Sequence, residues 1–248
     1  MRPFILLLLF ALAAGGCAQT RTIKTPIYED RRLEVTLHRV VGPDSIPLEK
    51  GYSHPVDFKV EDLKYFLRSI RYREKTLFGW SDAKRVFSAA ELYRMTPHLV
   101  DAFAKAEPDD EVVFRSDAAK SGTLFSSERL TGGRMFLRNG KLNCIFGNIN
   151  ANPQAPDIFE GDPRKVYAGA LSELVTNDWQ NLVAGERGTH YNWIELDWKR
   201  ALAEQMQKER ALRMRIERRR SIERMRRRET EDWMNWQPDE AFEPEIDR

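Results

Sequence analysis

Apolar residues between about residues 31 and 195 follow two different periods, which predicts a domain of strands and helices. Within residues 31–41, apolar side chains alternate with polar ones around Leu33, Val35 and Leu37, the period of a β-strand. Residues 111–116 are expected to form a second strand. Residues 60–70 and 88–106 instead repeat their apolar positions every three or four residues, as one face of an α-helix does.

Local signals mark the ends of two of these elements. Ser88 is followed three residues later by Glu91, the spacing of a capping box at the start of a helix. Pro97 is expected to kink or restart that helix, because its ring removes a hydrogen-bond donor and crowds the preceding turn. Residues 133–149 are expected to form two strands joined by Asn139-Gly140, whose tolerance of positive φ suits a tight hairpin turn.

Residues 162–183 return to helical spacing, with Tyr167, Leu171 and Leu174 as candidate core residues. Strands and helices do not alternate strictly along the chain, and one pair of strands is a hairpin. The pattern therefore favours an α+β fold, in which an antiparallel or mixed sheet carries helices packed on one face, together with a long charged C-terminal helix.

The beginning of the C-terminal helix carries a narrow apolar stripe. Six residues fall within an arc of about 120° if each residue advances 100°: Ile194, Trp198, Leu202, Met206, Leu212 and Ile216. This stripe is expected to dock the start of the helix on the domain or on another chain. The expected organisation is a signal segment at 1–16, a polar tether at 17–30, an α+β domain at 31–195, a basic extended helix at 196–230 and an acidic tail at 231–248.

The formal net charge of +2 conceals two opposite blocks near the C-terminus. Residues 199–228 contain thirteen Lys and Arg against four Glu, whereas 229–248 contain eight acidic residues against one Arg. The densest basic part, 213–229, holds nine arginines in seventeen residues. These are the candidate residues for binding a polyanion or a partner: Arg213, Arg215, Arg218, Arg219, Arg220, Arg224, Arg226, Arg227 and Arg228.

The N-terminus has the pattern of an export signal. Arg2 precedes an apolar run at 4–14, which is shorter than the roughly 20 residues needed to span a bilayer. The following Ala14-Gly15-Gly16-Cys17 resembles the lipobox of bacterial lipoproteins, with Ala14 in place of the usual Leu. The alternative is an ordinary secretory signal in which Cys17 is incidental.

The resemblance covers about twenty residues and concerns the signal alone. It implies that Cys17 is lipidated, becomes the mature N-terminus and attaches the chain to a membrane. Ala18-Gln19 follows the cysteine instead of an Asp, so the resemblance further implies an outer-membrane lipoprotein facing the periplasm if the cell is diderm.

The residues that could bind metals are few and dispersed. The chain has two cysteines, Cys17 and Cys144, so neither a disulfide framework nor a cysteine-based zinc site is expected, and Cys144 is predicted to be a core residue. The four histidines share no helix turn, and the sequence predicts no metal site and no cofactor: His38, His54, His98 and His190.

Two short motifs and one aromatic segment bear on catalysis and binding. Ser81-Asp82-Ala83-Lys84 matches S-x-x-K, and Lys120-Ser121-Gly122 is similar to the K-T/S-G element of penicillin-binding proteins and β-lactamases. The intervening S-x-N element is missing, the two motifs are too close together, and the domain is too small for that fold, so a non-enzymatic protein is predicted. The aromatic residues of 190–198 allow an alternative, glycan binding.

Three interpretations of the arginine run stay open. It binds anionic lipid headgroups or lipopolysaccharide phosphates, it is a protein-binding arm of an envelope assembly, or the acidic tail folds back and neutralises it. Export makes nucleic acid an unsuitable partner. The resulting hypothesis is a membrane-anchored, non-enzymatic envelope lipoprotein that interacts through its charged C-terminal helix. The alternatives are a lipid- or glycan-binding envelope protein and a small envelope hydrolase.

Overall fold

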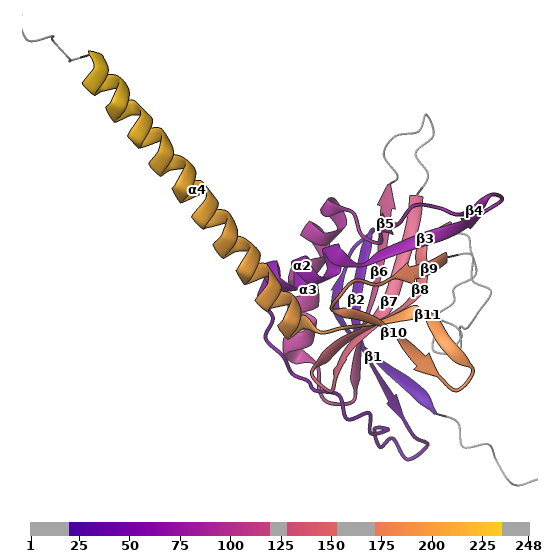
Figure 1. Cartoon of the computed structure of the whole chain (residues 1–248). Helices are drawn as coiled ribbons and strands as arrows, with labels where there is room; N and C mark the ends of the chain where they lie inside the picture. Colours follow the sequence, from indigo (N-terminus) through magenta and orange to yellow (C-terminus); the bar gives the residue numbers. More distant parts are fainter. Residues whose placement is uncertain (1–19, 120–127, 153–171, 235–248) are drawn as a thin grey trace, which may run out of the picture. The chain divides into compact units, whose positions relative to one another are not determined.

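The computed structural model describes residues 20–119, 128–152 and 172–234 (Figure 1). The chain divides into two compact units, Met1–Ala201 and Leu202–Arg248, and each is described by itself.

The first unit is built on a seven-stranded antiparallel sheet with the strand order β1-β2-β6-β7-β8-β11-β10. Its strands are β1 (Arg21–Glu29), β2 (Leu33–Val41), β6 (Asp110–Ala119), β7 (Glu128–Arg138), β8 (Lys141–Ala151), β10 (Gln180–Gly185) and β11 (Gly188–Leu196). A smaller sheet contains β3 (Arg71–Thr76), β4 (Gly79–Trp80), β5 (Lys84–Arg85) and β9 (Ser172–Val175). The helices are α2 (Val60–Ser69), α3 (Ala89–Lys105) and α4 (Trp198–Met234).

One face of the large sheet is covered by helices, as the sequence predicted. Helix α3 packs on β2 and β6, and α2 packs beside α3, on the side of the sheet seen at the left in Figure 1. Alternate residues of β2 point at these helices and are buried: Leu33, Val35 and Leu37. The prediction of an α+β fold with an antiparallel or mixed sheet and a long C-terminal helix is therefore confirmed.

The two local signals that predicted element ends are both present. Ser88 Oγ accepts from the Glu91 backbone N at 3.2 Å, and Glu91 Oε2 accepts from the Ser88 backbone N at 2.8 Å, which completes the capping box of α3. Asn139 and Gly140 adopt φ of 53° and 71° in the turn between β7 and β8. Pro97 does not restart α3, which is continuous through it. Core contacts on both sides of the proline outweigh the one hydrogen bond that it removes.

Two expected segments are different in the structure. Residues 21–29, expected within the tether, form the edge strand β1, which is held by backbone pairing with β2 and is mostly exposed. Because most of its side chains are exposed and many are polar, the sequence of β1 shows no alternation of apolar and polar residues.

Residues 172–183, expected to be helical, contribute instead to β9 and β10. Asn177 turns the chain between them by accepting from Trp179 N at 3.1 Å, and Leu174 is buried as expected, although on a strand. Tyr167 and Leu171 lie outside the described residues.

The start of the C-terminal helix is also later than expected. Ile194 lies in β11, so it is not part of the helical stripe. Helix α4 begins at Trp198, and the Asp197 carboxylate accepts from the Arg200 backbone N at 3.0 Å, the geometry of an N-cap. An Asp directly before the first helical residue is a signal that the sequence offered for the correct boundary.

Gly133 lies beneath the aromatic centre of the core. It pairs with Phe114 on one neighbouring strand and with Phe146 on the other, and both rings meet Phe87 at centroid distances of 5.7 and 5.9 Å. A Cβ at position 133 would lie 2.6 Å from the Ile145 carbonyl oxygen and 3.0 Å from the Phe114 ring. Position 133 therefore requires glycine, because there is no space for a side chain between the neighbouring strands.

We predict that Gly133→Ala lowers the free energy of unfolding by about 1–3 kcal/mol, the usual cost of overpacking a dense core. The close atoms are a backbone carbonyl and a ring held by its neighbours, so neither can move aside cheaply. Chemical denaturation measures the change. An unaltered midpoint would show that the strand pair adjusts to a side chain at this position.

His54 is a buried histidine without a hydrogen bond to either ring nitrogen. Its ring contacts Phe103 and Tyr52 at centroid distances of 5.6 and 5.9 Å. Burial lowers the pKa of His54 to about 4, against a smaller opposing effect of the Asp110 charge. The folded protein therefore keeps His54 neutral over a range of pH in which the same histidine is protonated in the unfolded chain.

We predict a loss of stability as the pH falls from about 6.5 to about 4, because only the unfolded state gains the His54 proton in this interval. Above pH 6.5 the group is neutral in both states and contributes no pH dependence. The full loss is about 3 kcal/mol, from a pKa difference of roughly 2.5 units at 1.36 kcal/mol each. Denaturation series at several pH values should show a shallower slope for His54→Leu than for the parent chain; equal slopes would contradict this assignment.

Candidate functional site: the arginine helix and the polar clusters of the domain

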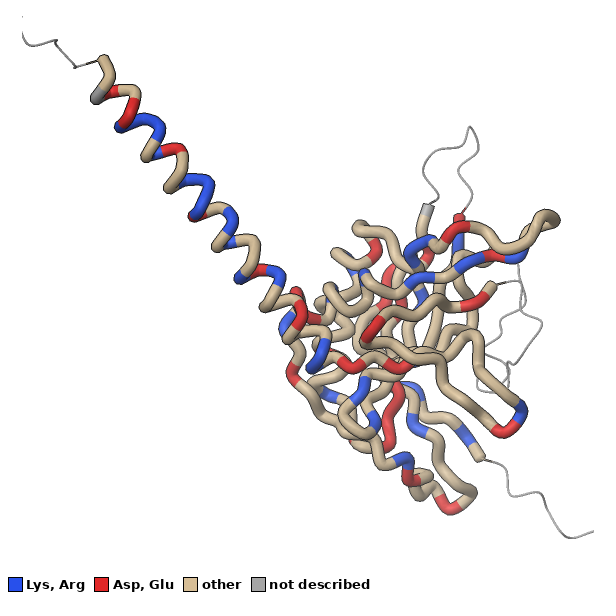
Figure 2. The backbone as a smooth tube through the Cα atoms, viewed as in Figure 1, with Lys and Arg blue, Asp and Glu red and all other residues tan. Residues whose placement is uncertain are grey.

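The predicted arginine cluster lies on α4, a helix of 37 residues. All nine candidate arginines between Arg213 and Arg228 are exposed, and single Glu residues separate groups of positively charged positions along this part of the helix (Figure 2). Lys208 pairs with Glu204 one helical turn before it, at i,i+4 spacing. Glu209 accepts from Gln205 at 3.2 Å. The described part of the arginine run is thus a solvated helix surface whose guanidinium groups are accessible.

The apolar stripe of α4 is buried only at its beginning. Trp198 packs edge-on against Phe58 at a centroid distance of 5.6 Å, and both residues belong to the first unit. Farther along, Met206, Leu212 and Ile216 have exposed fractions of 52%, 56% and 41%. Packing of the start of the helix on the domain is thus observed at Trp198, within the first unit, and docking of the rest of the stripe on the domain or on another chain stays a prediction.

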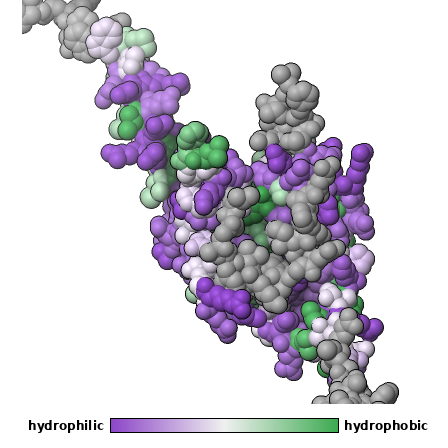
Figure 3. All heavy atoms as spheres, turned by 90° about the vertical axis from the view of Figure 1, so that its right-hand side faces the viewer, coloured by the Kyte–Doolittle hydropathy of each residue, from purple (hydrophilic) through white to green (hydrophobic). Residues whose placement is uncertain are grey.

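Three other apolar residues of α4 lie on a different side of the helix from the stripe. At 100° per residue, Met214, Ile222 and Met225 fall well outside the stripe of Leu212 and Ile216, and all are exposed. Figure 3 shows small hydrophobic patches along this helix, separated by hydrophilic surface. A helix that is polar on nearly all sides is either solvated or bound to a partner.

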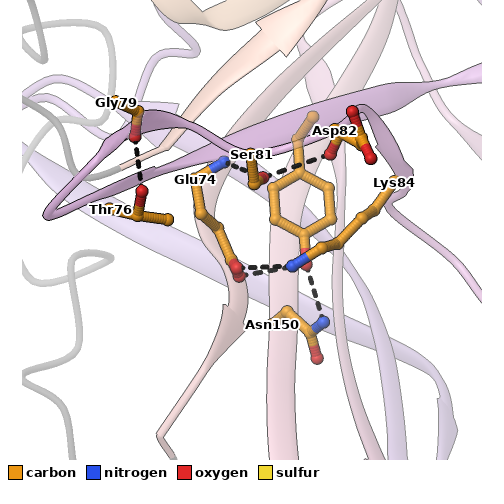
Figure 4. Close-up of polar contacts among 8 residues, drawn as sticks. Glu74, Thr76, Gly79, Ser81, Asp82, Lys84 and Asn150 are labelled. Carbon is orange, nitrogen blue, oxygen red and sulfur yellow. Dashed lines mark hydrogen bonds and ion pairs between the residues drawn. The ribbon is translucent and has the colours of Figure 1, made fainter.

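A polar cluster on β3, β4 and β5 contains the S-x-x-K motif (Figure 4). The Lys84 ammonium pairs with Glu74 Oε2 at 2.8 Å, and this hydrogen bond raises the pKa of Lys84. Ser81 Oγ donates to the Asp82 carbonyl at 3.1 Å and accepts from the Glu74 backbone N at 3.1 Å. The Lys84 ammonium therefore pairs with Glu74, and this pairing favours its protonated form.

The same cluster connects the small sheet to the large one. Tyr72, buried on β3, donates toward Glu74 Oε1 at 3.3 Å and accepts from Asn150 Nδ2 of β8 at 2.8 Å. Burial is the main cause that raises the pKa of Tyr72, so the phenol stays protonated. These contacts position the base of the β3–β4 hairpin. Lys120-Ser121-Gly122, the second motif, lies outside the described residues.

A second polar cluster lies on the face of the large sheet opposite α3. Glu111 is buried and accepts from Tyr52 Oη at 2.6 Å and from Arg134 Nη1 at 3.0 Å. His38 is the register partner of Glu111 on β2, and burial together with the charges of Arg134 and Lys24 lowers the pKa of His38 to about 4. A buried carboxylate that is fixed by a phenol and a guanidinium is suited to holding Tyr52 on the sheet.

The other candidate residues are distributed over the domain. His98 stacks on Tyr28 at a centroid distance of 3.6 Å, and His190 is buried on β11. Cys144 is fully buried on β8, as predicted, and burial raises the pKa of its thiol. Within residues 20–119, 128–152 and 172–234, no group of three His, Cys, Asp or Glu is placed to hold a metal ion.

The aromatic segment at 190–198 is divided between two elements. Trp193 on β11 donates its Nε1–H to Asn143 Oδ1 at 3.0 Å and packs against Phe136, whereas Trp198 lies on α4. These two rings therefore serve separate contacts. Cys17, the predicted lipidation site, lies outside the described residues. Among the helices of the described part, none combines the length and the hydropathy needed to cross a bilayer.

Comparison with other proteins gives no family for this chain. No protein-family model matches it, and no curated protein and no solved structure matches it.

Proposed function

We propose that this protein is a membrane-anchored envelope lipoprotein that binds a partner through α4. The observation that carries the proposal is the exposure of nine arginines along one long helix. Anchoring through Cys17 is supported by the lipobox-like Ala14-Gly15-Gly16-Cys17. The function is an interaction, and the proposal assigns no catalytic residue and no cofactor.

The distribution of side chains on α4 favours a protein partner with an acidic surface over a bilayer. A helix that lies in a membrane interface has an apolar face opposite a polar one. On α4 the apolar residues lie on two sides of the helix, the stripe and the side of Met214, Ile222 and Met225, and arginines lie among them on both sides. Guanidinium groups pair bidentately with carboxylates, so an acidic partner could engage several sides of the helix.

We predict that Cys17→Ala releases the protein from membranes, because a lipidated N-terminal cysteine would be the membrane anchor. Cell fractionation followed by immunodetection measures the distribution. A Cys144→Ala variant is the control, since this buried thiol has no part in anchoring and should leave the membrane fraction unchanged. Retention of the Cys17→Ala protein in the membrane fraction would refute anchoring by this residue.

We predict that replacing Arg219, Arg220, Arg227 and Arg228 together by Gln weakens partner capture, because it removes four positive charges and retains helix propensity. Crosslinking and pull-down from native membranes should recover less partner, and raising the salt concentration should weaken capture by the parent chain. Glu217→Gln with Glu223→Gln is the matched control, which alters the same helix and leaves the arginines in place. Equal recovery by both variants, or capture unaffected by salt, would contradict an electrostatic role.

A further inference from the structure

The β3–β4 hairpin ends in two adjacent apolar side chains that are entirely in solvent. Leu77 and Phe78 have exposed fractions of 98% and 101%, and Trp80 just behind them is 41% exposed. The hairpin extends beyond the large sheet at the right-hand side of Figure 1. Single exposed apolar residues are ordinary on protein surfaces, whereas a contiguous apolar group at a projecting tip is typical of a contact surface.

The turn itself does not require these two side chains. Thr76 Oγ1 donates to the Gly79 carbonyl at 2.8 Å (Figure 4). The same hydroxyl accepts from the Phe78 backbone N at 3.3 Å. Gly79 supplies the positive φ of 117°. The backbone of the turn is therefore held by Thr76 and Gly79, and polar residues at positions 77 and 78 would serve it equally well. Folding gives no reason for Leu77 and Phe78.

Cations are placed directly behind the apolar tip. Residues 71–85 contain five Lys and Arg against two acidic residues. Arg71, Lys75 and Arg85 form no ion pair with an acid in the described part of the chain, and all three are exposed. The Arg73 guanidinium lies 5.0 Å from the centre of the Trp80 ring and pairs with Glu173.

The order of these side chains along the hairpin matches the order of layers in a bilayer. Lys75 pairs with Trp80, one step behind the pair Thr76 and Gly79 that closes the turn. At about 3.3 Å per residue, Lys75 lies roughly 7–10 Å behind the tip, comparable with the interfacial layer of about 5–8 Å on each side of the hydrocarbon. Tryptophan favours this layer, and cations there are attracted to anionic headgroups.

We propose that the β3–β4 hairpin inserts into an anionic phospholipid bilayer. Leu77 and Phe78 enter the hydrocarbon, and Trp80 lies at the interface. Lys75 contacts the phosphate-bearing headgroups, whereas Arg71 and Arg85, roughly 20 Å behind the tip at about 3.3 Å per residue, add a longer-range attraction to the anionic surface. This contact goes beyond the function proposed above, because it needs neither lipidation of Cys17 nor α4.

An environment-sensitive fluorophore at the tip tests the proposal. The full chain with Cys17→Ser and Leu77→Cys is labelled with a nitrobenzoxadiazole group at position 77; buried Cys144 is protected from labelling. On mixing with phosphatidylcholine vesicles that contain phosphatidylglycerol, we expect a blue shift and a several-fold rise in emission. The matched control carries Tyr93→Cys instead, at an exposed aromatic residue of α3, and should not respond.

Two further variants separate the apolar and electrostatic parts of the contact. Adding Phe78→Ser should weaken partitioning by about tenfold, the expected effect of losing one large apolar side chain. Adding Lys75→Gln with Arg85→Gln should reduce the response to anionic vesicles toward that seen with phosphatidylcholine alone. An unchanged spectrum at position 77 with anionic vesicles, or equal responses at positions 77 and 93, would overturn the proposal. Because Cys17 is absent here, either result leaves the anchoring proposal to its own fractionation test.

Discussion

The packing of three phenylalanine rings over a glycine is the constraint on which the domain depends. Phe114 and Phe146 come from strands on either side of β7, and their rings can converge on Phe87 because Gly133 between them has no side chain. This contact joins the middle strands of the sheet to the segment that leads into α3. The register of β6, β7 and β8 is fixed by it, since a shift by one residue would turn these rings to the opposite face.

The same register determines what the opposite face carries. Glu111 and His38 lie beside each other on β6 and β2 because the residues next to them point toward α3. Arg134 and Tyr52 then satisfy the Glu111 carboxylate in a site where an unpaired charge would be costly. Tyr52 stacks on Phe136 at a centroid distance of 4.3 Å, so this polar contact also closes a small apolar cluster. The buried ion pair between Glu111 and Arg134 is therefore accounted for by packing on this face of the sheet.

Elements with strong local signals were predictable from the sequence, and elements held by distant partners were not. The capping box at Ser88 and the Asn139-Gly140 turn act over a few residues, so their chemistry is visible in the chain itself. Strand β1 is held by backbone bonds to β2 and has few buried side chains. Strands β9 and β10 have helical spacing locally, yet they pair with β3 and β11, and pairing outweighs local preference.

The same distinction holds for the candidate contact surfaces, one of which was predictable from the sequence and one of which was not. Charge density alone located the arginines of α4, because a long basic run is apparent without any fold. The hairpin tip was missed, since Leu77 and Phe78 look like ordinary core residues until the strands around them are known. The signal was nevertheless present: two apolar residues followed by Gly79, between strands of mostly polar residues. An apolar pair at the position of a turn, where polar residues are usual, indicates a contact outside the chain.

The two proposed contact surfaces depend on different forces, and this difference bears on how they would act in one molecule. The proposed binding by α4 would be mainly electrostatic, so it would weaken as salt shortens the screening length to about 8 Å at physiological ionic strength. The hairpin combines cations with Leu77 and Phe78, whose transfer from water is insensitive to screening. Rising salt would therefore release a partner from α4 before it released the hairpin from a bilayer. A protein built in this way would remain at the membrane while its partner exchanges.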